Sequence, residues 1–164
     1  MPTQLTRFWS WYERHYAFHV LLSTALFLLQ IFHLYWLATH VVLFKLVGES
    51  YFSPGPLFQN ILIAVDYTEI PAIISTSLLY INDLRKKVHW KGILFLLLLN
   101  SQWLHLFWIT DEFVVEQFLG NARDTLLPFW IAWIAIMIDY LEIPVIIDSI
   151  RRVIVLVRAR LSRA

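Results

Sequence analysis

Four long apolar stretches constrain the fold of this chain more than any other feature of its sequence. They cover residues 19–47, 57–81, 92–119 and 126–150. An α-helix rises about 1.5 Å per residue, so about 20 residues cross a hydrocarbon core of roughly 30 Å. Because 59% of all residues are hydrophobic and the mean hydropathy is +0.63, an ordinary soluble domain is excluded. The sequence predicts an all-α, multi-pass integral membrane protein whose four transmembrane helices form a bundle in the lipid bilayer.

The segments outside these stretches differ in charge, and the difference predicts an orientation. Residues 1–18 mix aromatic with charged side chains, which is typical of an amphipathic helix at the bilayer interface. Residues 82–91 form a basic loop and residues 151–164 a basic tail. These three segments hold 11 of the 13 Lys and Arg residues, and only Lys45 and Arg123 lie on the other side. By the positive-inside rule, both termini are predicted to be cytoplasmic.

The second half of the chain repeats two motifs of the first half. Residues 66–74 and 139–147 share the pattern DYxEIPxII and are identical at 7 of 9 positions. Residues 30–36 and 102–108 share the pattern QxxHLxW. The offsets are 73 and 72 residues, so the two motifs recur in the same order and at nearly the same spacing.

This repeat predicts two copies of one helical hairpin, residues 19–81 and 92–150. Each copy contains a span with a histidine followed by a span with an aspartate and a glutamate. Both copies start on the same side of the membrane, so the pseudo-two-fold axis between them is predicted to run along the membrane normal.

Six ionisable side chains fall near the middle of the predicted spans, where an isolated carboxylate is costly and indicates a functional site. Within each DYxEIP motif the two acids are three residues apart, about 4.5 Å along one helix face. Two divalent cations would neutralise the four carboxylates, and a mixture of imidazole and carboxylate favours iron, manganese or zinc. We therefore predict a site for two divalent transition metal ions, with iron or manganese preferred over zinc. The predicted ligands are His33, Asp66, Glu69, His105, Asp139 and Glu142.

Four further residues lie beside the predicted ligands. Gln30 and Gln102 precede the histidines by three residues, and they suit either a hydrogen bond to the free imidazole nitrogen or one between helices. Tyr67 and Tyr140 follow the aspartates. We expect them to pack at helix interfaces, with a redox or hydrogen-bonding role near the metals as the alternative.

Two other pairs of residues mark positions along the spans. His40 and Glu112 lie seven residues beyond the two histidines and are the repeat position at which the halves differ in chemistry. This pair would make the two metals inequivalent or mark a route from the outer side. Pro71 and Pro144 follow the glutamates by two residues. A proline inside a helix removes a hydrogen bond, so each is predicted to interrupt its span.

The ligand set resembles that of the di-iron and di-manganese carboxylate proteins of the ferritin type. Their four-helix bundles also direct four carboxylates and two histidines inward. The resemblance covers ligand inventory and symmetry, and it implies a dinuclear metal centre inside a helical bundle. Those proteins carry Glu and His on the same helix as ExxH, whereas here the histidines and the acids lie on different spans. The resemblance is therefore interpreted as convergence.

As a hypothesis, the chain is an oxidoreductase whose two metals act on dioxygen, on a reactive oxygen species or on a lipid-soluble small molecule such as a quinone. The alternative is a transition-metal transporter or carrier. Three other interpretations stay open: haem held between His33 and His105, a path for ions or protons through the acids, and interhelical hydrogen bonding alone. The chain has no cysteine, which excludes thiolate sites and iron–sulfur clusters. The basic tail suits anionic lipid rather than nucleic acid, and the sequence leaves the oligomeric state open.

Overall fold

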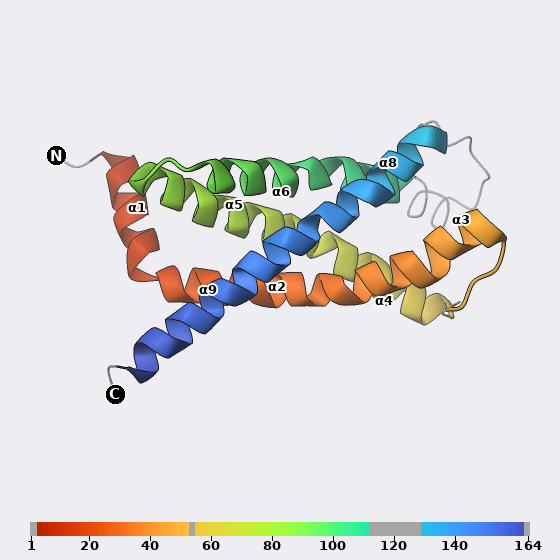
Figure 1. Cartoon of the computed structure of the whole chain (residues 1–164), viewed down its shortest axis with the longest axis horizontal. Coiled ribbons are helices and arrows are strands. Elements are labelled where there is room, and N and C mark those ends of the chain that lie inside the picture. Colours follow the sequence, from red (N-terminus) through yellow and green to blue (C-terminus); the bar gives the residue numbers. More distant parts are fainter. Residues whose placement is uncertain (1–2, 53–54, 112–128, 163–164) are drawn as a thin grey trace.

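A computed structural model of the chain describes residues 3–52, 55–111 and 129–162, and the regular structure within them is entirely helical (Figure 1). Four helices in this part of the chain are long and apolar enough to cross a membrane. The predicted helical bundle with four candidate spans is therefore confirmed, as a multi-pass membrane protein requires. The four spans are Tyr16–Val47, Leu57–Lys86, Trp90–Ile109 and Trp130–Leu161.

The first span is continuously helical but changes its helix type along its length. It consists of α2 (Tyr16–Trp36), the π-helical segment η1 (Leu37–Val42) and α3 (Leu43–Val47). It begins three residues before the predicted start. A π-helical turn is rare and is found frequently at functional sites. The span ends at Val47, as predicted. Gly48 follows it, and its φ of 73° lies in the left-handed region that favours glycine at a helix end.

The second and fourth spans are interrupted at the repeated DYxEIP motif. In the second span a single residue, Thr68, separates α4 (Pro56–Tyr67) from α5 (Glu69–Lys86). In the fourth span α8 (Phe129–Asp139) passes through the 3-10 turn η3 (Tyr140–Glu142) into α9 (Ile143–Leu161). The prolines that follow these breaks cannot donate a backbone hydrogen bond. The predicted interruptions are therefore present, and α9 continues beyond residue 150 into the tail.

The third span is α6 (Trp90–Ile109), which begins at a side-chain cap. The His89 ring nitrogen Nδ1 accepts a hydrogen bond of 2.8 Å from the backbone N–H of Gly92. The predicted stretch continues to residue 119, but residues 112–119 lie outside the described part of the chain. The predicted start of the fourth stretch at residue 126 also lies outside it.

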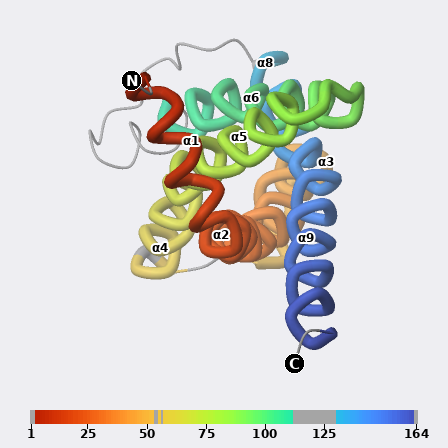
Figure 2. Tube along the Cα trace, turned by 90° about the vertical axis from the view of Figure 1, so that its left-hand side faces the viewer, coloured from red at the N-terminus to blue at the C-terminus, as the bar shows by residue number. Residues whose placement is uncertain are grey.

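Each histidine-bearing helix packs against both acid-bearing spans. Helix α2 contacts α4, α5 and α9, whereas α6 contacts α5, α8 and the η3 turn. Helix α9 crosses the other helices obliquely, and its C-terminal end extends away from them (Figures 1 and 2). Both ends of the chain lie at the same end of the bundle (Figure 1). This arrangement leaves the middle of the bundle accessible to side chains from all four spans.

A short amphipathic helix, α1 (Gln4–Arg14), lies across the end of the bundle that carries the termini (Figure 2). Trp9 and Tyr12 are buried, and the guanidinium of Arg85 lies 4.1 Å from the centre of the Trp9 ring. Burial raises the pKa of the Tyr12 hydroxyl, so this phenol stays neutral. Other apolar side chains of α1, such as Leu5 and Trp11, are exposed. One face of α1 therefore packs on the bundle, and the other is suited to the bilayer interface.

Three apolar clusters lie in the described part of the chain, one of them where α1 packs on the bundle. The other two lie before and after the predicted ligands along the spans, with a polar layer between them. One cluster contains Trp36, Leu62, Trp108 and Ile136. Each of these residues is three or four positions along the chain from a predicted ligand of its own span. The second cluster lies on the other side of the ligands and brings together residues from all four spans. It comprises Phe27, Ala72, Ile73, Tyr80, Leu99, Leu106, Val145 and Ile146. The polar layer is thus separated from both ends of the bundle by packed hydrocarbon.

Candidate metal centre

The six predicted ligands converge in the polar layer between the two apolar clusters. Each is at most 2% exposed, and they come from four different spans. Burial of ionisable groups is costly unless they are paired, hydrogen-bonded or bound to a metal. The partners of each side chain therefore decide what the layer can do. The residues are His33 on α2, Asp66 on α4, Glu69 on α5, His105 on α6, Asp139 on α8 and Glu142 in η3.

The two histidines and Asp139 form the first potential ligand group. One ligand atom from each lies within 4.8 Å of the other two. The carboxylate of Asp139 is 3.4 Å from Nε2 of His33 and 3.8 Å from Nε2 of His105. The imidazole rings are 5.3 Å apart between centroids and are inclined by 71°. Both Nε2 atoms thus face the same carboxylate, an arrangement suited to one metal ion between them.

The other nitrogen of each imidazole is held by a different kind of partner. Nδ1 of His33 contacts a carboxylate oxygen of Asp66. Nδ1 of His105 lies 3.4 Å from the backbone carbonyl oxygen of Ala135. Histidines that bind metals usually donate their second ring N–H to a carboxylate or a carbonyl, which fixes the ring and the tautomer. Both contacts leave Nε2 as the nitrogen directed toward Asp139.

Glu69, Asp139 and Glu142 form the second potential ligand group. Their ligand atoms also lie within 4.8 Å of one another. Both carboxylate oxygens of Glu142 and one of Glu69 are buried without a hydrogen-bond partner in the described part of the chain. Leaving a buried polar atom unpaired costs about 1–3 kcal/mol, and more for a charged group. Three such oxygens would cancel much of a typical free energy of unfolding of about 5–15 kcal/mol. Binding of a cation or of protons by this group would remove that cost.

The helix interruption explains why Asp139 and Glu142 share one small volume. In a 3-10 turn, side chains three residues apart eclipse one another rather than diverging as on an α-helix. The turn η3 ends at Glu142, and Asp139 immediately precedes it. In the second span, the N–H of Thr68 donates to the carbonyl oxygen of Val65 at 2.9 Å, which also spans three residues. In both copies of the DYxEIP motif, the helix therefore changes from four-residue to three-residue hydrogen bonding next to the acids.

The two glutamines tie each histidine helix to the backbone of an acid helix. Nε2 of Gln30 donates to the carbonyl oxygen of Val65 at 3.1 Å. Nε2 of Gln102 donates to the carbonyl oxygen of Ile138 at 2.9 Å. Each acceptor immediately precedes an aspartate of the ligand set. Of the two predicted roles, the structure shows the hydrogen bond between helices, which sets the distance between histidine and acid.

Tyr67, Tyr140 and His40 belong to neither ligand group. The hydroxyl of Tyr67 lies 2.8 Å from that of Thr110, and Tyr140 packs against the Trp36 cluster. His40 lies in the π-helical segment, where its Nδ1 is 2.6 Å from the hydroxyl of Ser50. Its predicted counterpart Glu112 lies outside the described residues. The interface role expected for the tyrosines therefore agrees with their contacts.

An ion-pair network at the end carrying the termini was absent from the sequence-based predictions. Arg152 donates to Asp83 at 2.6 Å and to Asp148 at 2.9 Å. Lys91 donates to the other oxygen of Asp148 at 2.7 Å, and the hydroxyl of Tyr80 donates to Asp148 at 3.2 Å. The spacing of Asp148 and Arg152 by four residues is a helical ion-pair signal. The partners on α5 and α6 carry no such local signal.

Comparison of the chain with known protein families, with curated proteins and with solved structures finds no match. The functional argument therefore rests on the chemistry of the site, because a helical bundle alone is compatible with many functions.

Proposed function

We propose that the polar layer is a dinuclear centre for divalent transition metals, in which Asp139 bridges the two ions. The observation that carries this proposal is that Asp139 belongs to both potential ligand groups. One ion would be held by His33, His105 and Asp139, and the other by Glu69, Asp139 and Glu142. Asp66 would orient His33 through Nδ1. The four carboxylates in the layer balance the charge of two divalent ions.

The geometry around the histidines supports metal ions over haem. Haem needs an open slot between its axial ligands. Between His33 and His105 the ring centroids are 5.3 Å apart, and Asp139 lies within 3.8 Å of both Nε2 atoms. A carboxylate occupies the position that a porphyrin would need. The DxxE acids would also be left without partners in a haem protein.

We propose further that this centre is an oxidoreductase site for dioxygen, a reactive oxygen species or a lipid-soluble molecule such as a quinone. Iron or manganese would supply the redox chemistry, and the chain would supply ligand geometry, charge balance and a dry interior. The six ligand side chains are at most 2% exposed, which would limit the access of water. Exposed apolar side chains on the spans, including Phe32, Ile74 and Met137, would contact the bilayer, in which a lipid-soluble substrate would dissolve.

We also propose that the centre arose from two copies of one hairpin related by a pseudo-two-fold axis along the membrane normal. Two pairs of equivalent contacts support this relation. Gln30 and Gln102 bond the carbonyls of equivalent residues, as described above. His33 and Trp36 have ring centroids 5.6 Å apart, and the counterparts His105 and Trp108 are 5.5 Å apart.

Metal analysis of the full chain, purified without chelators, tests the proposal. We expect about two iron or manganese ions per chain, because the proposed centre has two ligand groups and each would hold one ion. The matched control is Glu49→Gln, which removes an exposed carboxylate outside the bundle interior and should retain both ions. A haem absorbance spectrum, or protein without bound metal, would overturn the assignment.

A second assay separates the enzyme from a metal transporter. His40 is the residue that favours a transporter. It lies in a π-helical segment of the same span as His33, where it would mark a route for ions from the outer side. Purified protein should oxidise a quinol under oxygen, whereas proteoliposomes should not accumulate manganese or iron. Uptake without turnover would replace the enzyme with the transporter.

A further inference from the structure

Arg151 lies beside the ion-pair network at the end carrying the termini but takes no part in it. Lys91 and Arg152 together pair with Asp83 and Asp148, so these four charges balance. Arg151 is exposed, and within the described part of the chain it makes no ion pair or hydrogen bond. Arg151 therefore adds one positive charge beside a network whose own charges balance.

Arg151 lines a groove between α6 and α9. The groove has a volume of about 250 Å³. Lys91 and Arg151 contribute cations, and Phe95, Pro144 and Ile147 contribute apolar surface. The ammonium of Lys91 lies 5.0 Å from the centre of the Phe95 ring, and its side chain is 58% exposed. The ammonium therefore retains donors for a further ligand.

The two helices present their groove residues in the same order. Lys91 and Phe95 are four residues apart on α6, as are Ile147 and Arg151 on α9, so each pair lies on one helix face. On both helices the cation is nearer the end that carries the termini, and the apolar residue is nearer the middle of the span. Ile147 is 54% exposed. The groove thus changes from basic to apolar along the expected membrane normal.

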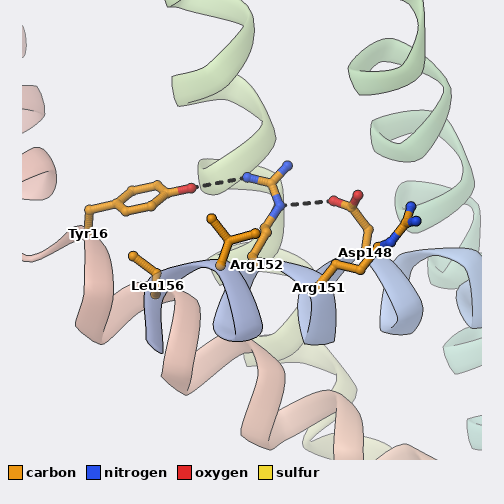
Figure 3. Close-up of a pocket in the computed structure, with 6 residues that line it drawn as sticks. Tyr16, Asp148, Arg151, Arg152 and Leu156 are labelled. Carbon is orange, nitrogen blue, oxygen red and sulfur yellow. Dashed lines mark hydrogen bonds and ion pairs between the residues drawn. The ribbon is translucent and has the colours of Figure 1, made fainter. Parts of the chain in front are cut away.

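A second groove on the other side of α9 meets the first at Asp148 and Arg151. Its volume is about 300 Å³, and it is lined also by Tyr16 and Leu156 (Figure 3). There the guanidinium of Arg152 lies between Tyr16 and Asp148 and donates to both, at 3.2 and 2.9 Å (Figure 3). The guanidinium of Arg152 therefore already bonds to protein groups. The side chain of Arg151 lies on the side of Asp148 that faces away from Arg152 (Figure 3).

We propose that the groove between α6 and α9 binds an anionic glycerophospholipid. The lipid phosphate binds Arg151 and Lys91, and an acyl chain lies along Phe95, Pro144 and Ile147. Arginine suits this role because its planar guanidinium can donate two hydrogen bonds to one phosphate. Basic pockets between transmembrane helices are recognised sites for anionic headgroups. The excess charge and the apolar floor select a lipid over a soluble anion.

Native mass spectrometry of the detergent-purified full chain, titrated with phosphatidylglycerol or phosphatidylcholine, tests this site. The protein should retain phosphatidylglycerol in preference to phosphatidylcholine. Arg151→Gln should weaken phosphatidylglycerol binding about fivefold, the effect of one basic side chain near an anionic lipid. Arg151→Lys should retain most of the binding. Because Arg151 is exposed and unpaired, Arg151→Gln should unfold at the temperature of the unsubstituted protein.

The control is Arg158→Gln, which removes the same charge from the exposed tail on α9 and should leave the affinity unchanged. Equal losses in Arg151→Gln and Arg158→Gln would reduce the effect to general surface charge and overturn the site. Equal retention of the two lipids would also overturn it. Displacement of the lipid by glycerol phosphate at equal concentration would show a phosphate site without acyl-chain recognition, which contradicts the proposal.

Discussion

Two aspartates at the same position in the repeat make different contacts. Asp66 contacts Nδ1 of His33, whereas Asp139 faces the Nε2 atoms of both His33 and His105. His105 instead directs Nδ1 toward the carbonyl oxygen of Ala135. The sequence motif is nearly identical in both halves, so the difference arises from how the helices cross. In the proposed centre, Asp66 would orient a ligand and Asp139 would be shared by the two ions.

This difference predicts unequal effects of the same substitution. Asp139→Asn should lose most of both ions, because it removes the shared carboxylate. Asp66→Asn should keep both ions at high metal concentration but bind them about 10–100-fold more weakly, as expected for loss of the partner of a ligating histidine. Metal content and competition with a chelator measure the two effects. An equal loss of metal in the two variants would contradict these roles.

At the scale of single elements, interruptions and caps position the ligands. The break in the fourth span lies between Asp139 and Glu142, which belong to one potential ligand group, and the break in the second span lies between Asp66 and Glu69. At the start of α6 the backbone fits closely around His89. A Cβ atom on Gly92 would lie 2.3 Å from Cε1 of the His89 ring and 2.7 Å from its Nδ1. A side chain at residue 92 would collide with the His89 ring in its capping position, so the cap as seen here requires glycine.

Gly92→Ala should lower the free energy of unfolding by about 1 kcal/mol or more, because it displaces a side-chain cap. Thermal unfolding in detergent measures the change. Gly55→Ala is the matched control, since a Cβ atom there meets nothing within 4 Å and the backbone φ of −65° suits any residue. Equal unfolding temperatures for the two variants would show that the His89 cap does not stabilise α6.

At the scale of the whole molecule, Arg152 joins parts of the chain that are distant in sequence. Its guanidinium donates to Tyr16 on α2, to Asp83 on α5 and to Asp148 on α9. Asp148 in turn accepts from Lys91 on α6. All four spans therefore meet in one network at the end carrying the termini. The network therefore links α9 to the other three spans.

Arg152→Gln should reduce the free energy of unfolding by about 3 kcal/mol, because it leaves Asp83 and the largely buried Asp148 short of a cation. Lys86→Gln is the control. It removes an exposed pair with Glu13, in which both side chains are roughly half exposed, and should cost at most about 1 kcal/mol. Denaturation of both variants in the same detergent gives the comparison. A similar small loss for Arg152→Gln would show that the network contributes little.

The spans, the helix breaks and the polar residues near mid-membrane could be read from the sequence, because each depends on local properties. Apolar length predicts a span, and a proline after DYxE predicts an interruption. The inward direction of His33, His105 and the four acids follows from the cost of placing charge in lipid. The predicted orientation, with both termini cytoplasmic, rests on charge distribution alone and stays a prediction.

Only the tertiary structure decided which of these groups meet. Asp139 reaches both histidines, Asp66 reaches one, and Arg152 pairs with Asp83 across 69 residues. Such pairings depend on the crossing of helices, and a helical period constrains only neighbours three or four residues apart. The sequence by itself determined that a layer of polar residues lies inside a membrane bundle. The packing of α9 and the interruption at η3 determined that one carboxylate stands at its centre.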